Sequence, residues 1–332
     1  MVKAIATRIG STAAVLLVLS LAVFFIQRTL PADPVRALVG RTASPEVIAA
    51  ARERLGLDQP VIVQYFQFLG GLLRGDAGTS LRTRNPVLDD IAAYLPATLE
   101  LVVVAITIAL VAGFVLGVVS SRGGWLSTGV TAVSVAGSSA ATFLVAILAV
   151  LVFYRNLGWF PAGGQSSSGA AVGPTGFVLV DTLLSGDLGA WFDAWHHVLL
   201  PAAVLAVGPA VAIGRTFRGS LRSTLQSEFI RSAYAKGFGW HTVVLRHATR
   251  NALGPAVSMA GLQLGMLFAG SIVVEKVFSW PGVGGYLFNS IGVSDFPAIV
   301  GVVLVMGLIY VVVNFAVDMI QLAVDPRQRK VA

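Results

Sequence analysis

The amino-acid sequence predicts an all-α membrane protein with six transmembrane helices. Of its 332 residues, 56% are hydrophobic and only 12% are charged, unlike an ordinary soluble domain. The mean hydropathy is strongly positive, at +0.82. The apolar residues also gather in runs long enough to cross a bilayer, which needs roughly 20 predominantly apolar residues. Any single run could be a buried core helix, but six in one chain argue against a soluble core.

The six apolar runs define the expected spans, which we place at about residues 9–26, 99–119, 128–154, 198–214, 256–274 and 298–317. The first run alone could belong to a cleaved signal peptide, because Lys3 and Arg8 precede it. Gln27, Arg28 and Pro31 follow it in place of a small-residue cleavage site, so we expect it to remain as a span.

The distribution of Lys and Arg predicts that both termini are cytoplasmic. Short loops rich in these residues stay inside. With the N-terminus inside, the inner segments hold 13 of the 23 Lys and Arg, whereas the two shorter outer loops hold only Arg155 and Lys276. The net charge of +7 is therefore mainly a signal of topology, and we expect no nucleic-acid partner.

The predicted spans divide the chain into four segments. These are a cytoplasmic N-terminus with the first span (1–28), an extracytoplasmic segment (29–98), a core with five spans (99–323) and a cytoplasmic tail (324–332). The extracytoplasmic segment should form short helices on the membrane surface. One lies between Ser44, a favourable N-cap, and Gly56, and another covers VIVQYFQFLGGLL at residues 61–73.

The longest inner loop, residues 215–254, is too polar to span the membrane but has a helical pattern. Apolar residues recur at helical spacing in two groups, Phe229, Ile230, Ala233 and Tyr234 and then Trp240, Val243, Val244 and Ala248. Gly237 and Gly239 separate the groups, which predicts two short amphipathic helices that meet at a glycine turn. Such a unit could lie on anionic lipid or dock into a groove of a protein partner, and the pattern favours neither.

Two motifs in this loop resemble those of binding-protein-dependent ABC importer permeases. EFIRSAYAKG (228–237) is similar to E-Y-V-R-T-A-R-A-K-G of the peptide-importer branch, and RHATRNALGP (246–255) is similar to its R-H-A-L-R-N-A-L-L-P. Further matches are PADP at 31–34, LDQP at 57–60, GDAGTS at 75–80, VVEKVFSWPGVGGYL at 273–287, and DPR at 325–327. The resemblance covers essentially the whole chain in order.

This resemblance implies the six-span type I ABC importer permease fold in a bacterial inner or plasma membrane. It implies a second homologous permease subunit, two ATP-binding subunits that drive the pair, and an extracytoplasmic solute-binding protein that delivers a peptide substrate. The chain itself would be no enzyme and would bind no cofactor, because ATP and Mg belong to the partner subunits. No Walker-type phosphate loop occurs in the sequence.

The resemblance further implies that residues 228–237 form the coupling helix, seated in a cleft of one ATPase. The apolar anchors would be Phe229, Ile230, Ala233 and Tyr234, while Arg231 and Lys236 would pair with acidic residues at the rim and Gly237 would end the helix. The sequence departs from the general E-A-A-x-x-x-G signature, because Arg231 stands where that signature has glutamate. Glu228, the sole acidic residue of the loop, could substitute for it. Tyr234 and Gly285 replace arginines that are common in the peptide branch.

Few polar residues lie within the spans. Gln263 and Asn314 could line a polar pore or bridge helices by hydrogen bonds. Asp318 lies near the inner boundary, where an ion pair with Arg215 or Arg218 is the favoured interpretation. Outside the spans, Asp193, His196 and His197 have the spacing of metal ligands. Without cysteine or a further ligand nearby, the start of a helix at the membrane interface is the preferred interpretation.

The sequence leaves alternatives open for both the cargo and the class of function. The same architecture could import nickel chelates, glutathione, haem or another small solute. An ion-coupled secondary transporter is less favoured, because it needs several buried ionisable residues near the midplane and the spans offer almost none. A non-transporting membrane scaffold is the third alternative.

Overall fold

The computed structural model describes residues 2–29, 44–54, 58–122, 124–125, 127–129, 132, 137, 140–167 and 173–324. Within these residues the secondary structure is helical, apart from turns and an isolated antiparallel bridge between Thr79 and Pro86. The all-α prediction is therefore confirmed. The predicted tail after residue 324 and the PADP motif at 31–34 lie outside the described residues.

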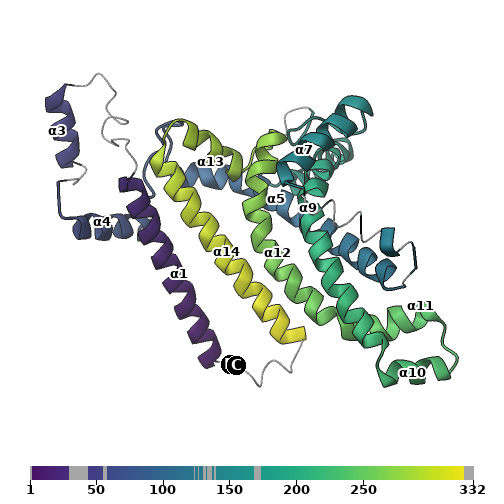
Figure 1. Ribbon diagram of the computed structural model, residues 1–332. Helices are drawn as coiled ribbons and strands as arrows, with labels where there is room; N and C mark the ends of the chain where they lie inside the picture. Colours follow the sequence, from purple (N-terminus) through teal and green to yellow (C-terminus); the bar gives the residue numbers. More distant parts are fainter. Residues whose placement is uncertain are drawn as a thin grey trace. The chain divides into compact units, whose positions relative to one another are not determined.

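The helices follow in chain order, and most of them are labelled in Figure 1. Their bounds are α1 Val2–Thr29, α3 Pro45–Arg54, α4 Val61–Leu73, α5 Val87–Ser121, α7 Thr142–Ala149, α8 Val178–Leu184, α9 Leu188–Leu225, α10 Glu228–Ala235, α11 Trp240–Thr242, α12 Thr249–Val277, α13 Val283–Gly292 and α14 Phe296–Val324. Two π-helical segments, η1 Val150–Asn156 and η2 Val243–Ala248, directly continue α7 and α11.

Four helical stretches are long and apolar enough to cross a membrane: Val87–Ser121, Leu188–Leu225, Trp240–Val277 and Phe296–Val317. They contain the predicted second, fourth, fifth and sixth spans. The first and third predicted spans overlap in part with shorter apolar stretches, Ala13–Phe25 and Thr142–Asn156. Part of the third predicted span lies outside the described residues, so the count of six spans stays a prediction.

The chain forms two compact units. The first contains residues 1–96 and 282–311, and the second contains residues 97–281 and 312–332. The core of the first unit consists of Val87, Ile91, Val283, Tyr286, Ala298 and Val302. Both helices predicted for its outer segment are present as α3 and α4, and α4 packs on α1, where the Tyr65 hydroxyl lies 2.9 Å from Ser20 Oγ.

The second unit is built around α9, which packs along α12 and close to α5. The α5 sequence GFVLG provides small residues at Gly113 and Gly117, and a Cβ at Gly117 would lie 2.5 Å from Cδ1 of Phe217. A Cβ at Gly214 would likewise lie 3.1 Å from the carbonyl oxygen of Gly113. Small residues four apart allow this close approach of two helix backbones within a membrane. The rings of Phe114 and Phe217 stack beside the contact at 5.2 Å between centroids.

The structure corrects two expectations about the inner loop. Helix α9 does not end near Arg215 but continues to Leu225, and its 38 residues extend about 57 Å at 1.5 Å per residue. This length exceeds the bilayer hydrocarbon core of about 30 Å, so the helix projects beyond it. The second predicted loop helix is also no separate short helix, because the helical chain runs unbroken from Trp240 to Val277.

Candidate functional site

Helix α10 forms the centre of the candidate site, and its apolar residues divide into two pairs. Ile230 and Ala233 are buried within the chain, at 0% and 8% exposure. Phe229 and Tyr234 remain 47% and 42% exposed. All four were expected to anchor a partner. This expectation is corrected for Ile230 and Ala233, because other residues of the same chain already bury their side chains.

A glycine turn ends α10, as the sequence predicts. The backbone N–H of Phe238 donates to the carbonyl of Ala233 at 3.3 Å, and the N–H of Gly237 donates to the carbonyl of Tyr234 at 2.9 Å. These bonds form a Schellman motif, which requires a left-handed residue after the helix. Gly237 supplies it with φ of +84°. Gly239, in contrast, has an ordinary φ of −72° and precedes α11.

The buried face of α10 packs on η2, the segment that follows the turn. The inward residues of η2 are Val243, Val244 and Ala248, each at 0% exposure. The same segment also contacts α9 and leads directly into α12. Because these elements are packed together, a force applied to α10 acts on the start of α12 through buried side chains.

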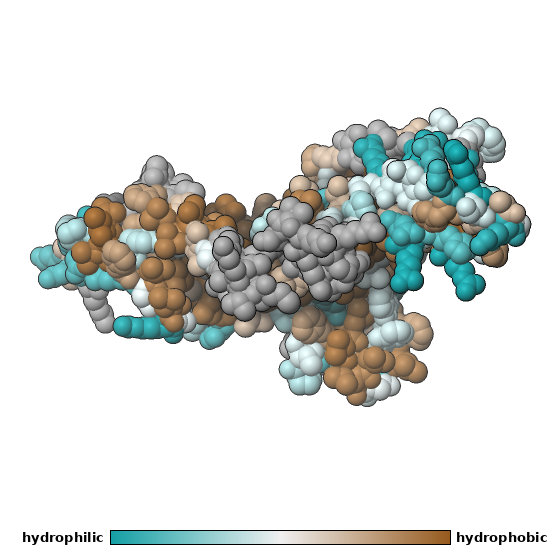
Figure 2. Space-filling view, turned by 90° about the horizontal axis from the view of Figure 1, so that it is seen from below, coloured by the Kyte–Doolittle hydropathy of each residue, from teal (hydrophilic) through white to brown (hydrophobic). Residues whose placement is uncertain are grey.

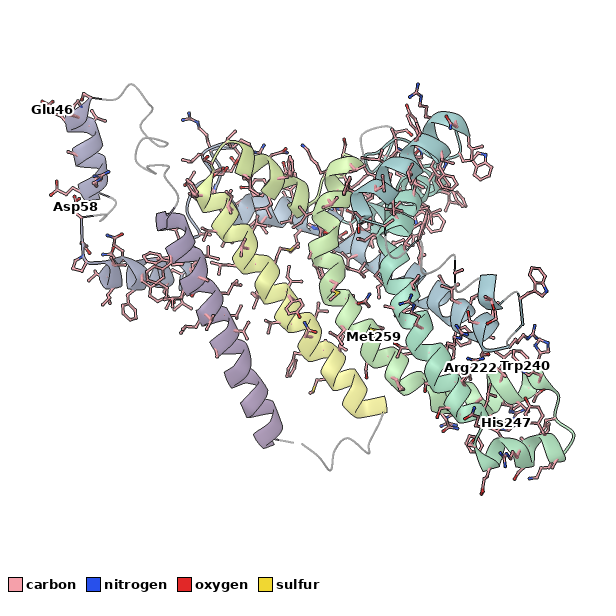
Figure 3. The ribbon with its side chains drawn as sticks, viewed as in Figure 1. Glu46, Asp58, Arg222, Trp240, His247 and Met259 are labelled. Atoms are coloured by element: carbon pink, nitrogen blue, oxygen red, sulfur yellow. The ribbon has the colours of Figure 1, made fainter. Side chains whose placement is uncertain are left out.

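Arg122, a cationic residue just after α5, holds the turn that follows α10. Arg122 directly follows α5, and its guanidinium lies over the ring of Trp240, 4.0 Å from the centroid. Its Nη2 donates to Nε2 of His241 at 3.1 Å. Figure 3 shows Trp240 with Arg222 and His247 at the end of α9, where α10 and α11 meet. Arg122 is one of the 13 basic residues of the inner segments that predict the topology, and nothing in the sequence indicates this contact.

The charged residues of α10 face outward. Glu228 in the first turn, Arg231 and Lys236 are all exposed. Figure 2 shows hydrophilic side chains gathered at the end of the molecule that carries α10 and α11. The exposed surface of α10 thus combines two aromatic side chains with one acidic and two basic groups, a composition suited to a protein partner.

The polar residues predicted within the spans lie on α12 and α14. Gln263 on α12 is half-buried and lines a half-open cavity between α12, α9 and the region that begins α7. Asn314 on α14 is half-buried. The side chain of Asp318 lies outside the described part of the chain, so its ion pair with Arg215 or Arg218 stays a prediction.

The candidate metal ligands fasten an outer loop to α9. Asp193 accepts hydrogen bonds from the backbone N–H and the hydroxyl of Ser167, each at 2.7 Å. His196 Nε2 lies 2.5 Å from the carbonyl oxygen of Trp159, and His197 Nδ1 lies 2.9 Å from that of Asp193. No group of three or more His, Asp or Glu in the described residues could hold a metal. The three residues lie in the first turns of α9, and their position at the membrane interface stays a prediction.

The first unit contains a buried acidic network that the sequence motifs did not reveal. Asp295 is fully buried and accepts a hydrogen bond from Ser80 Oγ at 2.5 Å and one from the backbone N–H of Arg82 at 3.2 Å. Asp90 accepts hydrogen bonds from the hydroxyls of Thr83 and Tyr286. Burial raises the pKa of Tyr286 to about 12, so its phenol remains a donor at neutral pH. The GDAGTS motif and Asp295 thus meet in space.

Comparison with known proteins agrees with this architecture. Residues 1–102 match the N-terminal family model of the membrane component of binding-protein-dependent transport systems. The dipeptide transport system permease protein DppB of Alkalihalophilus pseudofirmus is 37% identical over 94% of this chain and 95% of its own length. The glutathione transport system permease protein GsiC of Pectobacterium atrosepticum is also 37% identical, over 95% of this chain and 94% of its own.

A solved structure shares the fold. The inward-facing MetNI methionine ABC transporter matches with a TM-score of 0.51 and 20% identity, over 69% of this chain and 93% of the matched chain. Residues 105–330 match the family model described as binding-protein-dependent transport system inner membrane component. The chain belongs to this family of inner-membrane permease components.

Proposed function

We propose that this chain is the transmembrane permease subunit of an ATP-driven importer for di- or oligopeptides that a solute-binding protein delivers. It would form half of the translocation pore with a second, homologous permease subunit. Family membership supports the transport role, and the name of the dipeptide permease relative supports peptide cargo. The observation that carries the coupling role is α10, which is fixed to η2 on one side and exposes Phe229 and Tyr234 on the other.

In this proposal both termini and the loop 215–254 are cytoplasmic, and the segments 29–98 and 156–195 face the solute-binding protein. Two ATP-binding subunits hold ATP and Mg, and one of them receives α10 in a cleft. Phe229 and Tyr234 are the anchors, because exposed aromatic residues commonly dominate such interfaces. Glu228, Arg231 and Lys236 set the orientation of the helix by charge complementarity.

The packing suggests how closure of the ATPase pair reaches the pore. Movement of the cleft pushes α10, and its buried residues transmit the movement to η2. Because η2 continues into α12, the displacement reaches Gln263 and the cavity beside it. Packed interfaces switch between discrete arrangements instead of deforming gradually, so a short push can gate a pore.

Glutathione is the second candidate cargo, because the relative named as a glutathione permease is equally identical to this chain. One experiment separates the two cargoes and tests the proposal. The chain is co-expressed with its second permease, ATPase and solute-binding partners, purified by a tag on this chain, and reconstituted into liposomes. We expect ATP-dependent uptake of labelled dialanine. Preferred uptake of glutathione would assign the second cargo, and tagged protein that never retains ATPases would contradict the importer role.

A further inference from the structure

A half-open cavity of about 200 Å³ lies in the second unit, between α9, α12 and the region that begins α7. Its lining includes Leu205, Gly208 and Pro209 from α9 and Gln263 and Gly270 from α12. These residues lie near the centres of the predicted fourth and fifth spans, so we expect the cavity at mid-depth in the membrane. Drug-sized ligands need about 300–1,000 Å³. The cavity therefore has room for about one residue of a peptide and not for a whole oligopeptide.

The wall of the cavity carries both kinds of hydrogen-bonding group that a peptide unit needs. Gln263 brings a side-chain amide with donors and an acceptor, and Thr142 brings a hydroxyl. Pro209 has no backbone N–H, so the carbonyl of Leu205, four residues earlier, lacks its helical donor. Both Leu205 and Pro209 line the cavity, so the turn of α9 that carries this acceptor lies beside it. A lipid acyl chain could satisfy none of these groups.

Glycine leaves the space open beside these groups. Gly208 lines the cavity and is exposed, and a Cβ built on it would meet no heavy atom within 4 Å. A side chain at this position would therefore begin beside the cavity without a clash at its first atom. The absence of a side chain lets a ligand approach the α9 backbone closely.

We propose that this cavity is a cargo subsite that holds one residue of the transported peptide by its backbone. The carbonyl of Leu205 accepts from a cargo N–H, and the Gln263 amide donates to a cargo carbonyl. Recognition of the backbone leaves the side chain of the cargo unread, as an importer of varied peptides requires. This inference rests on the proposed function, because it takes the cargo to be a peptide.

Filling the cavity tests the subsite in the reconstituted transporter. Gly208→Leu should reduce the rate of dialanine uptake by on the order of tenfold or more, since the added side chain occupies the space of the cargo. Gly219→Leu is the matched control on the same helix, because a Cβ there also meets nothing within 4 Å and Gly219 does not line the cavity. Both variants should retain the ATPase subunits on purification as the wild type does, which shows that they assemble.

Removing the amide tests the hydrogen bond. Gln263→Met keeps the size of the side chain and should lower uptake about tenfold, the ratio expected for one lost hydrogen bond. Leu262→Met, at the neighbouring position that is 60% exposed and outside the cavity, should leave uptake unchanged. Wild-type uptake by both Gly208→Leu and Gln263→Met would overturn the subsite and leave peptide transport intact. Failure of the wild-type transporter to take up peptide would instead overturn the proposed function.

Cysteine protection identifies the occupant. The chain has no cysteine, so Thr142→Cys introduces a single thiol at the cavity and Leu262→Cys introduces one on the exposed face of α12. In nanodiscs, dialanine at ten times its half-saturating concentration should slow labelling of Thr142→Cys by a water-soluble thiosulfonate about tenfold. Labelling of Leu262→Cys should not respond to peptide. A Thr142→Cys thiol that stays unlabelled with or without peptide would indicate a lipid-filled cavity and contradict the proposal.

Discussion

The guanidinium of Arg122 lies over the indole of Trp240 at 4.0 Å from the ring centroid and also donates to His241. This pair joins the end of α5 to the first turn after Gly237. The loop that carries α10 is therefore held at two places, by its buried face on η2 and by a cationic clamp beside the turn. A loop held in this way transmits movement, whereas a free loop would absorb it.

Removing the clamp should loosen the turn without unfolding the spans. Arg122→Ala loses a cation–π contact and a hydrogen bond, together about 1–3 kcal/mol of local stability. We expect faster amide hydrogen exchange in residues 238–242 and less peptide transported per ATP hydrolysed. Arg250→Ala, a substitution of an exposed arginine on α12, is the control and should change neither quantity. Equal exchange rates in the two variants would show that Arg122 does not hold the turn.

The two pairs of apolar residues on α10 should respond differently to truncation. Ile230→Ala removes a fully buried side chain and should destabilise the loop by about 2–5 kcal/mol, since it leaves a cavity. Phe229→Ala removes a half-exposed ring and should leave thermal stability unchanged while it weakens binding to the ATPase by roughly tenfold or more. Thermal unfolding of the purified chain and titration with the ATPase measure both effects. If Ile230→Ala weakened ATPase binding and Phe229→Ala lowered thermal stability, then Ile230, and not Phe229, would lie at the interface.

The crossing of α5 and α9 should tolerate no added side chain at Gly117. A methyl group there would lie 2.5 Å from Phe217, so we expect Gly117→Ala to cost about 1–3 kcal/mol of stability. Gly219→Ala has open space at its Cβ and serves as the control. The midpoint of thermal aggregation in detergent reports the difference. Equal midpoints would mean that the two helices can separate without loss.

The phenol of Tyr286 should stabilise the first unit up to alkaline pH. Its pKa is raised to about 12 by burial from the ordinary value of 10.0, so the folded unit favours the neutral form. The resulting stabilisation is fully present below pH 10 and is lost as the pH rises through about 12. Tyr286→Phe keeps the ring but removes the donor to Asp90 and should cost about 1–3 kcal/mol at neutral pH. When the free energies of unfolding of wild type and variant are measured between pH 8 and about pH 12, the two values should converge at the alkaline end. A constant difference over this range would contradict the assignment.

Local features of the fold could be predicted from the sequence, because they depend on neighbouring residues. The periodicity of Phe229 to Tyr234 and the position of Gly237 define a helix and its end, and both are present. The periodicity identifies an apolar face but not what covers it, so the burial of Ile230 inside the chain was not foreseeable. The extension of α9 through Arg215 was missed because hydropathy does not distinguish a polar loop from a polar helix that leaves the bilayer.

Contacts between distant parts of the chain were beyond single-sequence reasoning. Nothing near Arg122 indicates that it meets Trp240, and the pairing of Ser80 with Asp295 depends on the folded first unit. The GFVLG sequence in α5 is an exception, because small residues four apart are a known signal for close helix packing and could have predicted the crossing with α9.

The left-handed turn at Gly237 gives the most direct test of the coupling proposal. Gly237→Val forces a β-branched residue to φ of +84°, whereas Gly239→Val occupies an ordinary φ of −72°, and neither new Cβ meets an atom within 4 Å. The decisive measurement is the number of dipeptides transported per ATP hydrolysed by the reconstituted complex. The coupling role predicts a large fall in this ratio for Gly237→Val, with membrane insertion retained, and a wild-type ratio for Gly239→Val. A wild-type ratio for Gly237→Val would contradict the role of α10 in coupling.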